Sequence, residues 1–166
     1  PGSGGAMLRH IGTITRTVTD MAAALDAMAG PDPRDLLCLP ESGGGYQREL
    51  SKGIRGRRIA FSPDFGYAKV HPDVAALCQG AVRKFEEAGA MVETPNFEWK
   101  DPYSIWSVFF FGTAASSLEA KLPKQGDLLD PGLKKVAEKG MALRGVDFGK
   151  ALADRHAFWE QVRRVY

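Results

Sequence analysis

A strand, a helix and a second strand follow one another between residues 58 and 93, and this succession constrains the fold more than any other feature. Residues 58–62 predict a short strand that ends before Pro63, and residues 90–93 predict another. Between them, Pro72 occupies a favoured first helical position and Gly89 ends the helical pattern. A strand–helix–strand unit favours parallel strands joined by a right-handed crossover. We therefore predict an α/β fold in which several helices pack on a small sheet containing this unit.

The predicted crossover helix carries an apolar stripe at spacings of three and four residues. We expect this stripe to face the sheet, and we interpret the cysteine within it as a small core residue. His71 is expected to belong to the start of the helix rather than to a metal site. The stripe consists of Val74, Leu77, Cys78, Ala81, Val82 and Phe85.

Another helix is predicted directly after Thr17, which resembles the start of a capping box because Asp20 follows three residues later. Gly30, as a left-handed cap, and Pro31 should end this helix. Residues 31–53 are rich in proline, glycine, serine and charge, which is typical of a long surface loop. Within that loop, residues 46–50 are compatible with one helical turn. Residues 1–7 are expected to be a flexible lead-in.

Three more helices are predicted in the second half of the chain. Asp101 with Pro102, and Asp130 with Pro131, each form an N-cap followed by a first-turn proline. The first of these helices should run towards Lys121, and the second should stop near residue 140. A last helix is predicted from Val146 or Asp147 and continues to the end of the sequence. Its predicted inner side consists of Phe148, Leu152, Trp159, Val162 and Val165 or Tyr166.

Charge and cysteine content narrow the class of protein. The 22 basic and 20 acidic residues leave a net charge of +2, and the basic residues are spread along the chain rather than clustered. We therefore expect no direct nucleic-acid partner. Two cysteines do not suggest a disulfide framework, so the expected location is the reducing cytoplasm. No apolar run approaches the length that crosses a bilayer, so no membrane partner is expected.

Residue patterns alone do not define a catalytic centre. The glycine-rich segments lack the strand-to-helix setting of a phosphate-binding loop, so nucleotide binding ranks last among the hypotheses. Ser116 and Ser117 lie on a predicted helix, where serine hydroxyls usually bond the preceding turn. The histidines are far apart in the sequence and predict no metal site, and no cofactor is expected. Cys38 lies in a loop without an identifiable activating partner.

The most apolar cluster of the chain lies on the helix predicted from Asp101. Its apolar residues surround most of the circumference, which indicates a helix that is buried on several sides or meets a partner surface. Aromatic side chains also line pockets for apolar ligands. The cluster consists of Trp106, Phe109, Phe110 and Phe111.

Two neighbouring stretches of the sequence resemble the amidase signature family. The family pattern is Gly-Pro-hydrophobic-Thr-Arg-Thr-Val-x-Asp, followed by a helix that ends in Ala-Gly-x-Asp-Pro-x-Asp. The chain has Thr13 where the family usually has proline, and Arg16, Thr17 and Asp20 match the pattern. The first stretch is His10-Ile11-Gly12-Thr13-Ile14-Thr15-Arg16-Thr17-Val18-Thr19-Asp20. The second is Leu25-Asp26-Ala27-Met28-Ala29-Gly30-Pro31-Asp32-Pro33-Arg34-Asp35.

This resemblance implies a parent protein that hydrolyses a carboxamide to carboxylate and ammonia. In the family, a lysine, a bridging serine in a cis peptide and a nucleophilic serine perform the reaction, and all three precede the matching motif. We carry no catalytic role onto this chain and expect it to be inactive alone. For Arg16, Thr17 and Asp20 we predict structural roles, such as bonds from Arg16 to neighbouring backbone carbonyls.

The resemblance also suggests where substrate would bind and which alternatives stay open. Trp106, Phe109 and Phe110 are the predicted wall of the acyl pocket, for a small-molecule amide in the full-length enzyme. One alternative is the A subunit of a tRNA-dependent glutamine amidotransferase, which hands ammonia to a partner enzyme. Another is a non-enzymatic α/β interaction module with an apolar docking helix.

The length of 166 residues is interpreted together with the family resemblance. We expect residues 1–166 to form a single domain that is an interior fragment of a larger amidase. Such a fragment would expose apolar surface around residues 106–111 and Trp159, or bury it by forming a homodimer with a second copy.

Overall fold

The computed structural model describes residues 12–34, 38, 44–97 and 99–165. The predicted lead-in therefore lies outside the described residues. The chain divides into two compact units. The strand unit comprises Ile11–Pro33 and Cys38–Asp101, and the helical unit is built mainly from Pro102–Tyr166. The expectation of a single domain stays a prediction.

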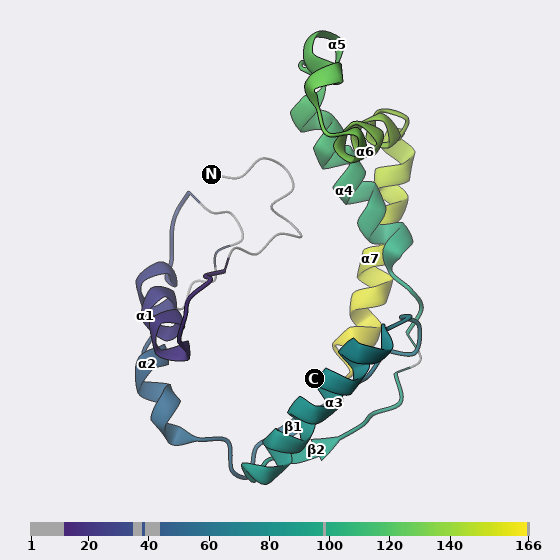
Figure 1. The fold of residues 1–166 in the computed structure, drawn as a ribbon. Coiled ribbons are helices and arrows are strands. Elements are labelled where there is room, and N and C mark those ends of the chain that lie inside the picture. The colour runs from purple at the N-terminus through teal and green to yellow at the C-terminus, as the bar shows by residue number, and fades with distance from the viewer. Residues whose placement is uncertain (1–11, 35–37, 39–43, 98, 166) are drawn as a thin grey trace. The chain divides into compact units, whose positions relative to one another are not determined.

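The predicted parallel unit is confirmed in the strand unit. Strand β1 (Arg58–Ala60) pairs in parallel with β2 (Met91–Glu93), and helix α3 (Pro72–Glu87) connects them (Figure 1). Arg58 lies opposite Met91, Ile59 opposite Val92 and Ala60 opposite Glu93. Both strands are shorter than predicted, although the Phe61 amide still donates to the Glu93 carbonyl at 2.8 Å.

Helix α3 starts as predicted, but most of its apolar stripe is not covered. The His71 Nδ1 atom accepts a hydrogen bond from the Asp73 amide at 3.3 Å and so caps the helix. Of the stripe, Val82 is buried, whereas Leu77 is 75% exposed. The core role predicted for Cys78 is wrong, because this residue is exposed. Two strands of three residues cannot cover one face of a 16-residue helix.

An aromatic cluster that the sequence did not predict forms beyond the carboxyl ends of the strands. The Phe65 ring stacks on Trp99 at 5.4 Å, and Phe97 contacts both rings. Phe65 has a φ of 54°, and its amide donates to the Ser62 hydroxyl at 2.8 Å. Gly66 follows with a φ of 82°, and a Cβ there would collide with the Phe97 carbonyl oxygen. The turn thus holds Phe65 over the segment that follows β2.

Helix α1 (Val18–Met28) begins with the predicted cap: Thr17 Oγ1 accepts from the Asp20 amide at 3.0 Å. It ends at Met28, with Ala29 as an extended C-cap, and Gly30 follows with a positive φ of 148°. The region predicted as a long loop contains helix α2 (Tyr46–Glu49) and the 3₁₀ helix η2 (Leu50–Lys52), in agreement with the expected helical turn. Helices α1 and α2 pack on each other.

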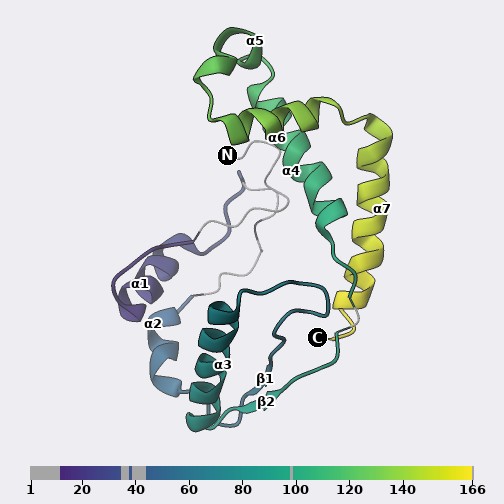
Figure 2. The same cartoon turned by 45° about the vertical axis from the view of Figure 1, so that its right-hand side comes forward.

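The helical unit consists of three longer helices and two short ones within the part of the chain that the structure describes. Helix α4 (Tyr103–Leu118) packs against α6 (Pro131–Met141) and α7 (Gly145–Val162), and Figure 2 shows α4 beside both. The short helices α5 (Leu122–Gln125) and η3 (Gly126–Leu128) lie between α4 and α6 in the sequence. Gly140 of α6 lies directly against the Phe111 carbonyl, where a Cβ would collide. Small residues therefore allow the α4 and α6 backbones to approach closely.

Of the two N-caps predicted in the helical unit, one is confirmed and the other is wrong. Asp130 caps α6 as predicted, because its Oδ1 atom accepts from the amides of Gly132 and Leu133 at 2.9 and 3.0 Å. The cap predicted at Asp101 is wrong, since Pro102 is the N-cap of α4 and makes no side-chain cap bond. Helix α4 ends at Leu118, three residues before the predicted end at Lys121. A separate short helix starts at Leu122, with Pro123 in its first turn.

The last helix is rotated relative to its predicted inner face. It begins at Gly145, where the Asp147 carboxylate accepts from the Arg144 amide at 2.8 Å and from the Arg144 guanidinium at 3.0 Å. It ends at Val162, followed by a turn. Leu152 and Trp159 were predicted to face inward but are 49% and 56% exposed. The covered side chains follow the helical period of 3.6 residues more closely. The covered stripe consists of Phe148, Ala151, Arg155, Phe158 and Val162, and Asp147 and Glu160 are also partly covered.

Candidate functional site

Three aromatic side chains form one exposed face of α4, which we call the aromatic face (Tyr103, Trp106 and Phe110). Spacings of three and four residues place them on the same side of the helix. The Tyr103 and Trp106 rings are 5.7 Å apart, and Trp106 stacks on Phe110 at 4.5 Å with 17° between the planes. Their exposed fractions are 54%, 40% and 44%. The structure thus brings together two of the three predicted pocket residues, Trp106 and Phe110, and adds Tyr103.

Phe109, the third predicted pocket residue, is not part of the aromatic face and contacts α7 instead. Its ring lies 6.4 Å from that of Phe148 on α7, at an interplanar angle of 70°, and it is half-buried. Phe111 is also half-buried, and the Lys139 ammonium lies 5.2 Å from the centre of its ring. Phe109 therefore contributes to packing of α4 on α7, whereas Trp106 and Phe110 are available to a ligand. The role of all three as a pocket wall stays a prediction.

The aromatic face is electrically neutral. Helix α4 has no acidic or basic residue in its first or last turn. The carboxyl groups with altered pKa in the helical unit belong to helix ends. A side-chain hydrogen bond from Arg144 lowers the pKa of Asp147, and one from Arg163 lowers the pKa of Glu160. These arrangements suit contact with an uncharged apolar group rather than proton transfer.

The residues that match the family pattern, Arg16, Thr17 and Asp20, lie at the start of α1. Thr15 Oγ1 donates to the Thr17 carbonyl at 2.8 Å, and Thr17 in turn caps the helix through the Asp20 amide. Asp20 also places a negative charge in the first turn, where the helix dipole favours it. Arg16 is exposed, and its bonding to backbone carbonyls stays a prediction.

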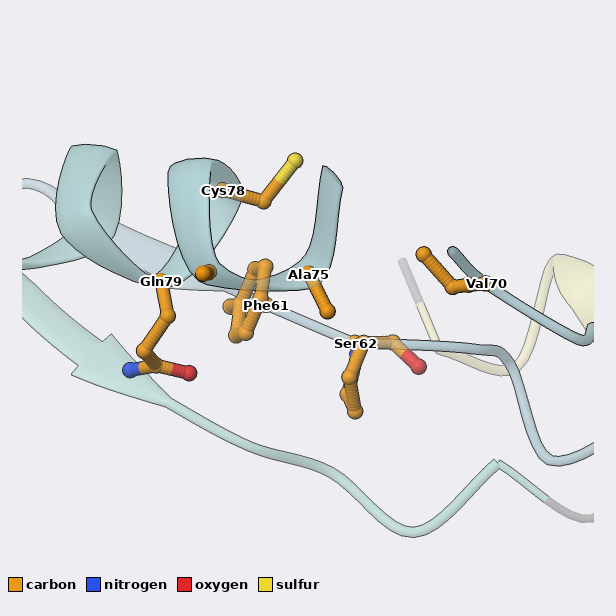
Figure 3. Close-up of a pocket in the computed structure, with 8 residues that line it drawn as sticks. Phe61, Ser62, Val70, Ala75, Cys78 and Gln79 are labelled. Carbon is orange, nitrogen blue, oxygen red and sulfur yellow. The ribbon is translucent and has the colours of Figure 1, made fainter. Parts of the chain in front are cut away.

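A shallow hollow that the sequence did not predict lies between α3 and the chain that follows β1 (Figure 3). It encloses about 330 Å³. The polar groups at its edge include Ser62 and Gln79, and the Ser62 hydroxyl already accepts from the Phe65 amide. The complete lining is Phe61, Ser62, Pro63, Val70, Ala75, Ala76, Cys78 and Gln79. With this lining the hollow can hold a small apolar group, but it assembles no acid–base pair.

Other candidate groups have structural partners. The Ser117 hydroxyl donates to the Thr113 carbonyl at 2.9 Å, which is the local bond expected for a helical serine. Within the described residues, no group of three or more histidine, cysteine, aspartate or glutamate side chains could hold a metal ion. Among the same residues, no helix has the length and hydropathy needed to cross a bilayer.

Sequence comparison places these features in a family. The profile of the Amidase family matches residues 3–164, and the chain therefore belongs to this family. An acylamidase of Rhodococcus erythropolis is 38% identical over 90% of this chain and 32% of its own length. An amidase of Pseudomonas putida is 28% identical over 96% of this chain and 34% of its own length. The chain spans about a third of the length of these relatives.

Two further comparisons concern an amidotransferase and the fold. The glutamyl-tRNA(Gln) amidotransferase of Pelobacter propionicus has an A subunit that is 33% identical over 66% of this chain and 22% of its own length. The crystal structure of a bacterial aryl acylamidase of the amidase signature family superposes with a TM-score of 0.79 at 23% identity, over 93% of this chain and 34% of that one. This superposition establishes the α/β fold of the family.

Proposed function

We propose that this chain is part of an amidase that hydrolyses a carboxamide C–N bond to carboxylate and ammonia. The observation that carries the proposal is the 38% identity to an acylamidase over 90% of the chain. The family profile covers the start of α1, where Thr17 and Asp20 stand at the positions of the pattern that the sequence resembles. The mechanism we propose for the complete enzyme is that of the family, with a lysine, a serine in a cis peptide and a nucleophilic serine.

The 166-residue chain by itself should be inactive. None of its residues is assigned to the lysine or to either serine of that mechanism. An assay of ammonia release from acetamide and benzamide, with this chain alone and with a protein extended to the family length, tests the proposal. We expect turnover only in the extended protein, and serine-dependent turnover by the chain alone would contradict the inactivity.

The aromatic face is the proposed substrate-facing wall of the acyl pocket, and Phe109, the third residue predicted for this wall, supports it from behind through its contact with Phe148. Its neutrality and its stacked rings support contact with an uncharged acyl group. In the extended enzyme, Phe110→Ala should lower kcat/KM for aromatic amides about tenfold more than for acetamide, because a lost apolar contact is worth about 1–3 kcal/mol. Equal changes for both amides would refute a role of Phe110 in substrate choice.

Phe109→Ala is the matched comparison for that test. Since Phe109 packs on Phe148, this variant should lower the free energy of unfolding as well as alter kinetics. Trp106→Ala should change the preference for aromatic amides over acetamide in the same direction as Phe110→Ala, because the two rings stack. A pattern in which Phe109→Ala changes substrate preference and Phe110→Ala does not would reverse our assignment of the substrate-facing side.

A second candidate is the A subunit of a tRNA-dependent glutamine amidotransferase. The 33% identity to such a protein supports it, although that match covers 66% of the chain whereas the acylamidase match covers 90%. Ammonia release from glutamine that requires a co-purified second protein would favour this candidate. Release from simple amides without any partner would favour the amidase.

A third candidate is an interaction module without catalysis, which would use its apolar helix for docking. The exposure of Tyr103, Trp106 and Trp159 supports such a surface and also the homodimer predicted from the sequence. Size-exclusion chromatography with light scattering would reveal a dimer of the 166-residue chain. If the aromatic face forms the contact, Trp106→Ser should return the chain to a monomer, and a persistent dimer would exclude that contact.

A further inference from the structure

The hollow beside α3 lies at the end of the sheet where parallel strands usually bind ligands. Phe61 and Ser62 directly follow β1, so the hollow begins at the carboxyl end of that strand. In open α/β sheets, ligands bind outside the carboxyl ends of the strands. The volume of about 330 Å³ falls within the range of small-molecule pockets. The opposite wall consists of Ala75, Ala76, Cys78 and Gln79 of α3.

The turn that follows Ser62 is held in one conformation by contacts outside the hollow. Phe65 has a φ of 54°, which residues other than glycine rarely adopt. Its ring stacks on Trp99 at 5.4 Å, and its amide donates to the Ser62 hydroxyl at 2.8 Å. Gly66 lies too close to the Phe97 carbonyl oxygen for a side chain. Strained backbone that its surroundings hold in place is typical of binding and active sites, and this turn leads away from the wall of the hollow.

The lining of the hollow determines which ligand it can accept. None of the eight described residues that form it is charged, and most of them are apolar. Two polar side chains stand at its edge, those of Ser62 and Gln79 (Figure 3). The Ser62 hydroxyl already accepts from the Phe65 amide, whereas the Gln79 side-chain amide can both donate and accept. An ionised ligand is disfavoured, because nothing in this lining offsets the removal of its charge from water.

We propose that this hollow is a binding site for a small uncharged molecule that carries an apolar ring and one hydrogen-bonding group, as phenol does. The ring contacts Phe61, Val70 and Ala76, and the polar group bonds the side-chain amide of Gln79. All lining residues belong to the strand unit, so the aromatic face of α4 is not part of this site. The site also does not depend on the proposed amidase activity.

Titration of the isotope-labelled 166-residue chain with phenol, followed by NMR, tests the site. The backbone amides of Val70, Ala75 and Ala76 and the side-chain amide of Gln79 should shift with one common Kd of about 1 mM, a value suited to so small a ligand. Amides in the last turn of α3 serve as controls and should not shift. Equal shifts along the whole helix, or no shift at concentrations well above that Kd, would overturn the proposal.

Ala76→Phe is the blocking variant, because its phenyl side chain would occupy the hollow in place of the ligand. Ala76 is exposed on α3, so the helix can carry the larger side chain without being displaced. We expect this variant to abolish the phenol-dependent shifts. Ala81→Phe is the matched control, since Ala81 is exposed on the same helix but does not line the hollow. If both variants bind phenol with the Kd of the parent chain, the hollow is not the site.

Three ligands and one further variant test the chemistry of the site. Gln79→Leu keeps the size of the side chain and should weaken phenol binding about fivefold, the effect of losing one net hydrogen bond. The same variant should leave toluene binding unchanged, because toluene has no hydrogen-bonding group. Benzoate should cause no shift at concentrations that saturate the site with phenol. If Gln79→Leu weakens both neutral ligands equally, Gln79 is not the hydrogen-bonding partner, and benzoate binding as tight as that of phenol would refute an uncharged ligand.

Discussion

The helical unit brings backbones together through small residues, whereas the strand unit also uses a polar side chain to join segments that are distant in the sequence. In the helical unit, Gly140 lies against the Phe111 carbonyl, and Ala115, Ala137 and Ala151 are buried. In the strand unit, Asp26 bonds the backbone of α2. Close helix packing tolerates no added volume, while a side-chain hydrogen bond can be removed at a moderate cost in stability.

The largest effect should come from Gly140→Val in the helical unit. A valine side chain would meet the Phe111 carbonyl and the Ala115 methyl group, so α4 and α6 must separate. We expect the free energy of unfolding to fall by about 3 kcal/mol, at the upper end of the usual cost of overpacking. Urea unfolding followed by circular dichroism measures this loss.

Gly149→Ala is the matched control on α7, because no atom lies within 4 Å of a Cβ at that position. Replacing glycine by alanine in an open helical position should raise the stability by about 0.5–1 kcal/mol. If Gly140→Val and Gly149→Ala changed the free energy of unfolding equally, close approach of the α4 and α6 backbones would not be what stabilises the helical unit.

Helix caps should have intermediate effects that are similar in the two units. Asp130→Ala removes the cap of α6 and Thr17→Ala removes the cap of α1. Each should cost about 1 kcal/mol, measured by urea unfolding and located by the loss of amide protection in the first turn of the affected helix. A loss several times larger for one of them would mean that its side chain supports tertiary contacts beyond the cap.

A smaller effect is expected on acidification of the helical unit. A side-chain hydrogen bond from Arg144 lowers the pKa of Asp147 in the folded chain. A lowered folded pKa stabilises the fold above the ordinary aspartate range, and this contribution disappears as the pH falls through the folded value. Thermal melting as a function of pH should show a shallower acidic decline in Asp147→Asn than in the parent chain. Identical declines would exclude the pair as a source of pH dependence.

The smallest effect should accompany Trp159→Ser. This side chain is 56% exposed, so its replacement should change the free energy of unfolding by less than about 0.5 kcal/mol. Phe158→Ser on the covered side of the same helix is the comparison and should cost several times more. If Trp159→Ser is the more damaging variant, the assigned rotation of α7 is wrong.

Local patterns predicted the helices and the strand pairing well. The caps at Thr17, His71 and Asp130 involve side-chain and amide groups two or three residues apart, so their signal lies within one turn of sequence. The aromatic face was predicted in part, because Trp106 and Phe110 belong to the most apolar cluster of the sequence. Tyr103 was missed, although it stands three residues before Trp106 and therefore on the same side of the helix.

Features that depend on contact between distant segments were not predictable in this way. The stripe of α3 suggested a buried Cys78, but the two short strands leave it exposed. Leu152 and Trp159 are apolar and stand near the edge of the stripe, and only the position of α4 decides which edge is covered. The turn at Phe65 and the bonds of Asp26 to α2 join segments whose proximity no local pattern encodes.

The sequence by itself determined the order of the elements, the parallel strand–helix–strand unit and the family, because these depend on local spacing and on motif residues. The tertiary structure decided which apolar faces are covered, which glycines permit close packing, and which backbone groups Asp26 holds. The physical reason is that burial and hydrogen bonding across distant segments depend on how the elements pack, while helix and strand periodicity describes one element at a time.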